Sequence, residues 1–272
     1  MRRWTTFLRI SVVASMVIGV GLTPAQSQAG AQTPVFVDKW GSFGTTNGLF
    51  NYAYAIASDP AGHVYVADAG NNRIQKFDSQ GNFLRKWGST GSGDGQFNFP
   101  NGIAADGSGH VYVVDTQNNR IQKFDSQGNF LRKWGSTGSG DGQFSNPRGI
   151  ATYAGGHVYV VDYQNVRVQE FNARGNFITE WGSAGTGNGQ FNAAFGVATG
   201  GNGSVYVTDI GSHRVQKFDA DGTFITKWGS AGTGNGQFDA PYGVATDDSG
   251  NVYVTDTYNF RIQKFHRRPR HR

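Results

Sequence analysis

A segment of 47 residues recurs along the chain and constrains the fold more than any other feature. The tripeptide Trp-Gly-Ser marks each repeat, and its tryptophans are Trp40, Trp87, Trp134, Trp181 and Trp228. Between these marks, runs of strand-forming residues alternate with turn signals. In the repeat that begins at Trp87, they predict strands at 102–105, 111–114, 120–124 and 130–134. Four strands in each repeat of this length are typical of a β-propeller with one blade per repeat.

The two ends of the repeated region predict how the ring closes. Residues 35–40 match only the fourth strand of the unit, whereas the last match, at 261–265, is a third strand. We therefore expect an all-β propeller of five four-stranded blades over residues 34–265, in which the N-terminal strand completes the last blade and hides its edge. Two alternatives remain: a truncated six-bladed ring, and an open five-blade arc that associates through its edge strand. The closed form is expected to be a monomer.

The central part of each repeat resembles the NHL repeat, in which Val-Tyr-Val-x-Asp leads through an Asn-rich turn to Arg-Ile-Gln-Lys-Phe. It stands here as VYVADAGNNRIQKF (64–77), VYVVDTQNNRIQKF (111–124), VYVVDYQNVRVQEF (158–171), VYVTDIGSHRVQKF (205–218) and VYVTDTYNFRIQKF (252–265). The resemblance implies a propeller. Six blades are the norm of that family, so five blades would be a departure from it.

Residues 1–29 have the pattern of an export signal. Arg2 and Arg3 precede an apolar stretch from Ile10 to Leu22, and small residues stand before a cleavage point after Ala29. The apolar stretch is too short to span a bilayer comfortably, although an uncleaved anchor is an alternative. We therefore expect an exported protein, secreted or periplasmic, with no membrane span in the mature chain.

Charge and cysteine content narrow the partner classes. Seven of the 24 basic residues lie at the two ends, in residues 1–29 and in the tail HRRPRHR (266–272), so that 17 remain against 19 acidic residues. This near-neutral body argues against a nucleic-acid partner. The tail is either a disordered end or a site for an anionic glycan, lipid or nucleic acid. The absence of Cys excludes disulfides, Cys-ligated zinc and a Cys nucleophile.

In every repeat, an Asp and an Arg flank the turn between the second and third strands. An acid and a guanidinium so placed can pair with each other and with the loop backbone. Because a catalytic site is normally built once, we interpret pairs that occur five times as structural. They are Asp68 and Arg73, Asp115 and Arg120, Asp162 and Arg167, Asp209 and Arg214, and Asp256 and Arg261.

No cofactor, metal or catalytic residue is expected. His63, His110 and His157 occupy one repeat position on different blades, too far apart to share an ion. The Gly-rich loops with Asp94 and Asp141 lack the ligand spacing of a calcium site. Resemblance to the NHL-type peptide-amidating lyases, which hold zinc through His in the channel, implies the alternative of a metal-dependent lyase or hydrolase.

The candidate binding residues are the positions that vary between otherwise similar repeats. At the entry to the inner strand, where the channel mouth is expected, they are Tyr54, Asn101, Arg148, Phe195 and Tyr242. In the turns between second and third strands, they are Asn119, Gln164, His213, Tyr258 and Phe260. Aromatic, amide and cationic groups around a channel mouth favour recognition of a peptide, protein or glycan. We therefore expect a non-catalytic binding or scaffold module, although simple variation at exposed turns would give the same pattern.

Overall fold

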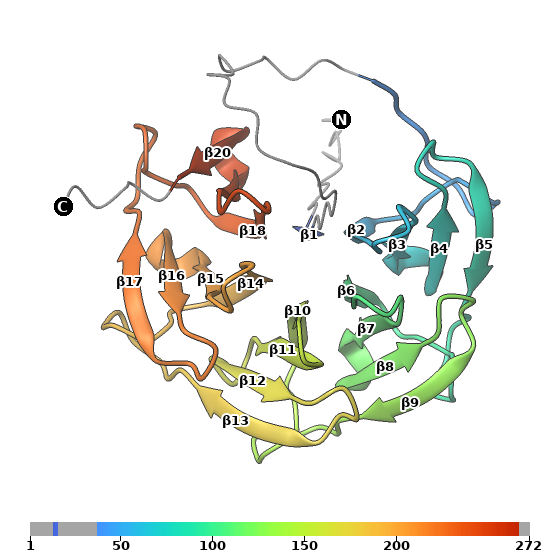
Figure 1. Ribbon diagram of the computed structural model, residues 1–272, viewed down its shortest axis with the longest axis horizontal. Coiled ribbons are helices and arrows are strands. Elements are labelled where there is room, and N and C mark those ends of the chain that lie inside the picture. Colours follow the sequence, from blue (N-terminus) through green and yellow to red (C-terminus); the bar gives the residue numbers. More distant parts are fainter. Residues whose placement is uncertain (1–12, 16–36, 267–272) are drawn as a thin grey trace, which may run out of the picture.

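The computed structural model describes residues 13–15 and 37–266, which form a β-propeller of five blades (Figure 1). The all-β, five-bladed fold predicted from the repeats is confirmed. Helical structure among these residues is limited to four short 3-10 turns: η1 (Ala69–Asn71), η2 (Thr116–Asn118), η3 (Ile210–Ser212) and η4 (Thr257–Asn259). No helix in the described segments is long and apolar enough to cross a membrane.

Each blade is an antiparallel sheet, and its strands lie side by side in sequence order from the channel to the rim. Blade 1 contains β2 (Ala53–Ser58), β3 (Val64–Asp68), β4 (Arg73–Phe77) and β5 (Phe83–Trp87). Blade 2 contains β6 (Pro100–Ala105), β7 (Val111–Asp115), β8 (Arg120–Phe124) and β9 (Phe130–Trp134). Blade 3 contains β10 (Pro147–Tyr153), β11 (His157–Asp162), β12 (Arg167–Phe171) and β13 (Phe177–Trp181). Blade 4 contains β14 (Ala194–Thr199), β15 (Val205–Asp209), β16 (Arg214–Phe218) and β17 (Phe224–Trp228). Blade 5 contains β18 (Pro241–Thr246), β19 (Val252–Asp256) and β20 (Arg261–Phe265).

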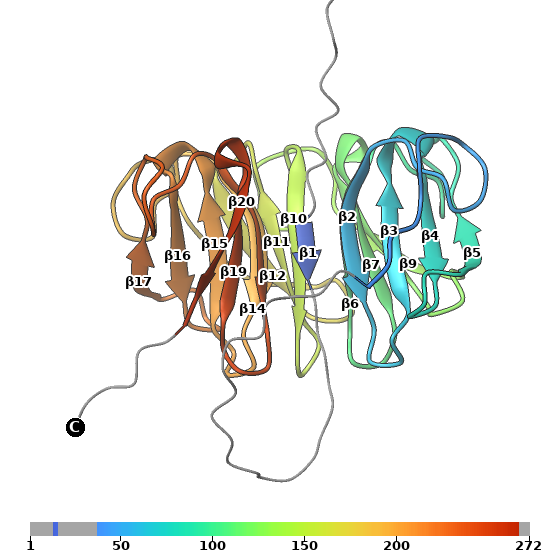
Figure 2. The ribbon, with the colours of Figure 1, turned by 90° about the horizontal axis from the view of Figure 1, so that it is seen from above.

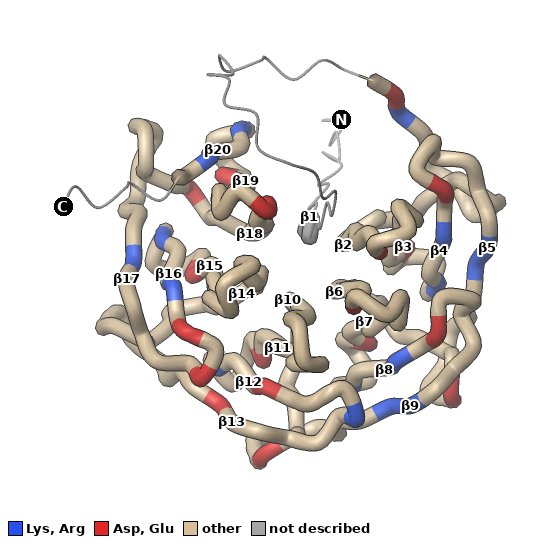
Figure 3. The backbone as a smooth tube through the Cα atoms, viewed as in Figure 1, with Lys and Arg blue, Asp and Glu red and all other residues tan. Residues whose placement is uncertain are grey.

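Burial falls from the middle of a blade to its rim, as the residue pattern predicts. In blade 2, all five residues of β7 and of β8 are buried, because neighbouring blades cover both faces of these strands. In β9, Leu131, Arg132 and Lys133 are exposed. Lys and Arg accordingly gather on the outer strands (Figure 3). The side view shows the strands running between the two faces of the disc (Figure 2).

A tryptophan at the end of each outer strand joins one blade to the next. Trp87 of blade 1 packs edge-on against Tyr65 of its own blade and, with ring centroids 5.8 Å apart, against Phe124 of blade 2. Its indole also covers Gly128, where a Cβ would lie 2.7 Å from the ring. Gly128 has φ +78°, so the turn beneath the indole requires glycine for two reasons. The same contact places Trp40 over blade 1, against Phe77 and Gly81.

The repeated Asp and Arg pairs lock loops from successive strands together. Arg120 Nε donates to Asp115 at 2.7 Å, and its terminal nitrogens donate to the carbonyls of Ser92, Gly93 and Gln96. Asp115 is fully buried and also accepts a hydrogen bond from the backbone N–H of Asn98. Each pair therefore holds the loop that enters its blade against the turn between the second and third strands.

The predicted closure of the ring is wrong. Within the described residues, β20 pairs with β19 alone, blade 5 has three strands, and residues 37–42 belong to no strand. The reason lies in the blade-to-blade packing: four regular steps carry the chain from β2 to β18 without bringing blade 5 beside blade 1 (Figure 1). Between them lies β1 (Val13–Ser15), which pairs in parallel with β2 and contacts β18. The remainder of the predicted signal peptide and of the basic tail lies outside the described residues.

Candidate functional site

The five predicted mouth residues lie at the start of the five inner strands, at one end of the channel. We call Tyr54, Asn101, Arg148, Phe195 and Tyr242 the channel-mouth ring. Glycines that follow three of them let neighbouring strands approach closely. A Cβ on Gly149 would lie 2.6 Å from the carbonyl oxygen of Phe195, and one on Gly196 would lie 2.5 Å from that of Tyr242. The ring is thus held by backbone contacts.

Aromatic side chains of the channel-mouth ring pack against one another. The rings of Phe195 and Tyr242 meet edge-on with centroids 4.7 Å apart, and Tyr54 meets Phe99 at 5.4 Å. Tyr163 packs edge-on against Phe195 at 6.0 Å. The mouth is therefore lined by rigid aromatic faces, which can contact a ligand with little loss of conformational entropy.

Arg148 is the only charged residue in strands β2, β6, β10, β14 and β18. Its guanidinium carbon lies 5.6 Å from the ring centre of Tyr163 and 5.7 Å from that of Phe195. Its Nε is buried without a hydrogen-bond partner in the described part of the chain. Burial lowers the pKa of Arg148, and nearby Tyr54, Tyr163 and Tyr242 partly offset this effect. The guanidinium nevertheless remains charged at neutral pH, because arginine does not deprotonate in proteins.

Asn101 is the second unsatisfied group of the channel-mouth ring. Only 5% of the residue is exposed, and neither its side-chain oxygen nor its side-chain nitrogen has a hydrogen-bond partner among the described residues. A buried polar group without a partner costs about 1–3 kcal/mol. Two inner strands in succession, β6 and β10, thus present polar groups that the fold itself does not satisfy.

Two of the predicted outer-turn residues mainly join blades. Asn119 accepts a hydrogen bond from the backbone N–H of Asn146 at 2.7 Å, and His213 Nδ1 accepts one from Ala240 at 3.3 Å. Both adopt positive φ at the end of their turns. The side chain at this repeat position therefore forms a hydrogen bond that connects its blade to the next one.

The other three outer-turn residues are exposed and do not form one group. Gln164 accepts a hydrogen bond from Ser145, and Tyr258 lies 6.5 Å from Tyr242 at the edge of the channel-mouth ring. Phe260, at the turn of blade 5, is 92% exposed. Only Tyr258 extends the channel-mouth ring.

Sequence reasoning missed two aromatic residues of the mouth. Tyr163 follows the turn Asp directly, and Phe99 precedes the inner strand of blade 2. Both positions vary between repeats, with Thr116 and Ile210 among the residues that replace Tyr163. That variation was the available signal.

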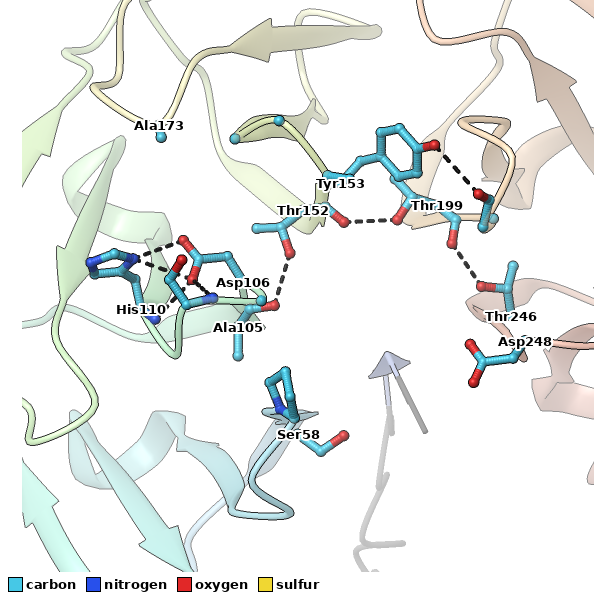
Figure 4. A pocket seen from close by; sticks show the side chains of 18 of the residues that line it. Ser58, Ala105, Asp106, His110, Thr152, Tyr153, Ala173, Thr199, Thr246 and Asp248 are labelled. Atoms are coloured by element: carbon cyan, nitrogen blue, oxygen red, sulfur yellow. Dashed lines mark hydrogen bonds and ion pairs between the residues drawn. The ribbon is translucent and has the colours of Figure 1, made fainter. Parts of the chain in front are cut away.

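A cavity of about 530 Å³ lies at the opposite end of the inner strands (Figure 4). Its lining includes Ala105, Thr152, Thr199 and Thr246, which form a series of hydrogen bonds around the channel. The Thr152 hydroxyl donates to the Ala105 carbonyl, the Thr199 hydroxyl to the Thr152 carbonyl, and the Thr246 hydroxyl to the Thr199 carbonyl, at distances of 2.7–2.8 Å. These hydroxyl donors already have partners, in contrast to the side chains of Asn101 and Arg148.

The acidic residues that line this cavity include Asp106, which accepts hydrogen bonds from His110 Nδ1 at 2.9 Å and the Tyr112 hydroxyl at 3.0 Å. Burial raises the pKa of Asp106, but a hydrogen bond from the backbone N–H of His110, together with those from its ring and from Tyr112, outweighs burial, and the pKa lies below its usual value. His63 pairs with Asp59 in the same way, whereas His157 pairs with Glu170. In the described segments, no three His, Asp or Glu residues gather where they could hold a metal ion.

We expect Asp106→Asn to flatten the acid branch of the stability profile. The pKa of Asp106 is lower in the folded than in the unfolded state, so its carboxylate stabilises the fold above the unfolded pKa of about 3.9. That contribution is lost as the pH falls through the folded-state pKa. Urea unfolding between about pH 5 and pH 2 measures it. Tyr112→Phe, which removes one hydrogen bond, should give an intermediate slope, and an unchanged slope for Asp106→Asn would contradict the assignment.

The family model described as "NHL repeat" matches this chain at residues 50–77, 97–124 and 238–265. B-box type zinc finger protein ncl-1 of Caenorhabditis elegans is 38% identical over 60 residues, which are 22% of this chain and 7% of that protein. Protein brain tumor of Drosophila melanogaster is 31% identical over 71 residues, 26% of this chain and 7% of that protein. The matches thus span a small part of these relatives.

Solved structures resemble the fold over most of this chain. Virginiamycin B lyase from Staphylococcus aureus superposes with a TM-score of 0.58 at 16% identity, covering 80% of this chain and 71% of that chain. A protein of a nidogen/laminin complex superposes with a TM-score of 0.56 at 18% identity, covering 82% of this chain and 83% of that chain. At such low identity, these likenesses establish the fold alone.

Proposed function

Because this chain is an NHL-repeat β-propeller, we propose that it is a non-catalytic interaction module that binds a protein or peptide at the channel-mouth ring. The observation that carries the proposal is the pair of unsatisfied groups at the mouth. The Asn101 amide and Arg148 Nε are buried without partners in the described chain, among aromatic side chains. A bound polypeptide would supply donors and acceptors to both.

The composition of the mouth supports a protein ligand. Residues that contribute most to protein interfaces are enriched in Tyr, Trp and Arg and lie near the centre of the contact. Tyr54, Arg148 and Tyr242 are of these types and lie around the channel axis. The nidogen/laminin complex shows a similar fold in an assembly of two proteins, which favours the same use here.

The alternative is an enzyme that acts in the channel. It is favoured by the fold likeness to virginiamycin B lyase. A lyase or hydrolase site needs ionisable side chains that converge on the reacting atoms. The described inner strands supply one charged side chain, Arg148, and the tyrosines Tyr54, Tyr153 and Tyr242, but no His, Asp, Glu or Lys. We therefore prefer the binding module.

Export forms part of the proposal. We propose that residues 1–29 direct the protein out of the cytoplasm and are then removed. Mass spectrometry of the protein from its host should find a mature N-terminus at Gly30. Intact protein starting at Met1 in the cytoplasm would contradict this part and leave the binding site unaffected.

Asn101→Ala tests the binding site without disturbing the fold. Both polar atoms of Asn101 lack partners, so their removal should leave the melting temperature unchanged or higher, because no hydrogen bond is lost. Peptides selected from a displayed random library on the full wild-type protein should bind the variant at least about tenfold more weakly. Leu131→Ala, at an exposed position on β9, is the matched control and should bind like the wild type. Equal binding to the Asn101 variant, or loss only with the Leu131 variant, would overturn the proposal.

A further inference from the structure

Arg148 differs from the other partly or fully buried arginines of the described residues in what surrounds its charge. The five turn arginines each donate to an Asp, and four of them also donate to three backbone carbonyls. Arg148 lies at the channel mouth, half-buried, and its guanidinium donates to no described carboxylate or carbonyl. A buried charge without a counter-charge is costly, so an anionic group that reaches it gains more than it would in water.

The aromatic walls determine how an anion can approach. The guanidinium lies close to the rings of Tyr163 and Phe195, which offer π-faces but no strong acceptors. Such contacts hold the guanidinium while its N–H groups point outward in its own plane. A planar fork of donors matches a carboxylate in a bidentate pair.

The charge at the mouth selects a carboxylate over a phosphate. Arg148 is the one cation on the five inner strands, so these described strands offer the ligand a single positive charge. A phosphate near neutral pH carries up to two negative charges and is normally held by several cations or backbone N–H groups. A carboxylate carries one negative charge, which the single positive charge of Arg148 neutralises.

We propose that Arg148 is the receptor for a carboxylate group of the bound polypeptide, with Asn101 on the neighbouring strand holding an adjacent amide. The inference rests on the proposed function and deepens it, because it states the charge of the ligand. The carboxylate comes either from the side group of an Asp or Glu or from the C-terminus of the ligand.

Three small probes test the inference on the full-length protein. N-acetylphenylalanine carries a terminal carboxylate, N-acetyl-aspartyl-phenylalanine amide carries its carboxylate on the aspartyl residue, and N-acetyl-asparaginyl-phenylalanine amide is neutral. Titration by NMR, observing the Arg Nε–H resonances, should show at least one carboxylate probe binding about tenfold or more tightly than the neutral probe. The better carboxylate probe identifies the source of the group.

Arg148→Met should abolish this discrimination, because it keeps the apolar contacts and removes the charge. Arg148→Lys should retain part of it, since an ammonium keeps the charge but loses the planar fork. Equal binding of charged and neutral probes, discrimination that survives in Arg148→Met, or tighter binding of inorganic phosphate would overturn the inference. The Asn101→Ala test of the mouth with selected peptides would still stand in those cases, so the two failures are distinguishable.

A separate observation concerns the end of blade 5. Ile262 in β20 is 62% exposed, whereas the equivalent Ile74, Ile121, Val168 and Val215 are fully buried. The outer edge of β20 has no partner strand among the described residues. Such an edge offers a row of backbone donors and acceptors to another polypeptide.

Residues 37–40 of a second copy match this edge. In blade 1, Ile74 lies opposite Trp87 and Lys76 opposite Arg85. The same register would place Ile262 opposite Trp40 and Lys264 opposite Asp38. Blades 1 to 4 carry no opposite-charge pair at the second of these positions, so the complementarity is specific to this pairing. Within one molecule, Trp40 packs on blade 1, which leaves β20 unpaired.

We propose that the edge of β20 pairs with residues 37–40 of a second copy. Light scattering on the full-length protein should show mass that increases with concentration. Asp38→Lys should raise the dissociation constant about tenfold, and adding Lys264→Asp should restore it. Asp141→Lys, on an exposed loop of blade 3, is the charge-matched control. A monomer at every concentration, or equal effects of Asp38→Lys and Asp141→Lys, would overturn this proposal.

Discussion

We expect Arg120→Met to lower the free energy of unfolding by about 3–5 kcal/mol, because it leaves a buried charge without its partner. Asp115 is fully buried, and Arg120 is 6% exposed. The change removes the ion pair and the hydrogen bonds to the carbonyls of Ser92, Gly93 and Gln96. The Gln96 carbonyl keeps a bond from Gln122 and the Gly93 carbonyl one from the Gln96 N–H, whereas the Ser92 carbonyl has no other donor among the described residues. Urea unfolding followed by tryptophan fluorescence measures the loss.

Blade 5 supplies the matched control for this effect. Arg261 makes the same contacts with Asp256 and three carbonyls, but its side chain is 30% exposed, against 7% for Arg120. Water can therefore replace part of what Arg261→Met removes, and we expect a cost of about 1–2 kcal/mol. If the two variants cost the same, burial does not determine the contribution of these pairs.

The second large effect is expected at the aromatic contacts between blades. Phe124→Ala should cost about 3–5 kcal/mol, because it leaves a cavity in a fully packed region. Phe124 is completely buried and contacts the rings of Trp87, Phe97 and Phe130 at centroid distances of 5.7–6.0 Å. Thermal and urea unfolding should both show the loss, without a change in the wild-type arrangement of strands by circular dichroism.

Phe265 is the equivalent residue at the open end of the ring. It contacts Trp228 and Phe238, no ring from a fourth strand lies beside it among the described residues, and it is only partly buried. Phe265→Ala should therefore cost at least about 1 kcal/mol less than Phe124→Ala, because less apolar surface is re-exposed. This difference is expected at protein concentrations at which the proposed pairing of β20 with a second copy is dissociated. An equal cost at both sites under those conditions would contradict the prediction.

Strand positions were predictable because each repeat contains the same alternation of strand-forming residues and turn signals. The third and fourth strands of blade 2 were predicted at their observed bounds, 120–124 and 130–134. The inner strand was predicted two residues late, since Pro100 and Asn101 do not resemble strand formers although they belong to β6. Tertiary packing there overrides local propensity.

Ring closure could not be predicted in the same way. The repeated sequence determines how one blade packs on the next, through contacts such as Trp87 on Gly128. It does not determine how many blades make a closed ring. The match of residues 35–40 to a fourth strand correctly indicated a vacant edge at β20. It did not indicate that residues 37–42 and β20 lie apart in one molecule.

The candidate site was predicted in outline and corrected in detail. Variation between repeats identified the channel-mouth ring, but it equally selected Asn119 and His213, whose side chains bridge blades. The binding candidates differ from these bridging residues in whether the polar atoms of the side chain have hydrogen-bond partners within the fold. Asn101 and Arg148 have unsatisfied atoms in the described part of the protein, which is a property of the packed structure.

The most direct test of the binding account is a crystal structure of the full-length protein with a peptide selected from the displayed library. We expect the peptide to lie over Tyr54, Asn101 and Arg148, with a carboxylate within about 3 Å of the guanidinium nitrogens. A peptide bound in the cavity at the other end of the channel, or along the free edge of β20, would contradict the account.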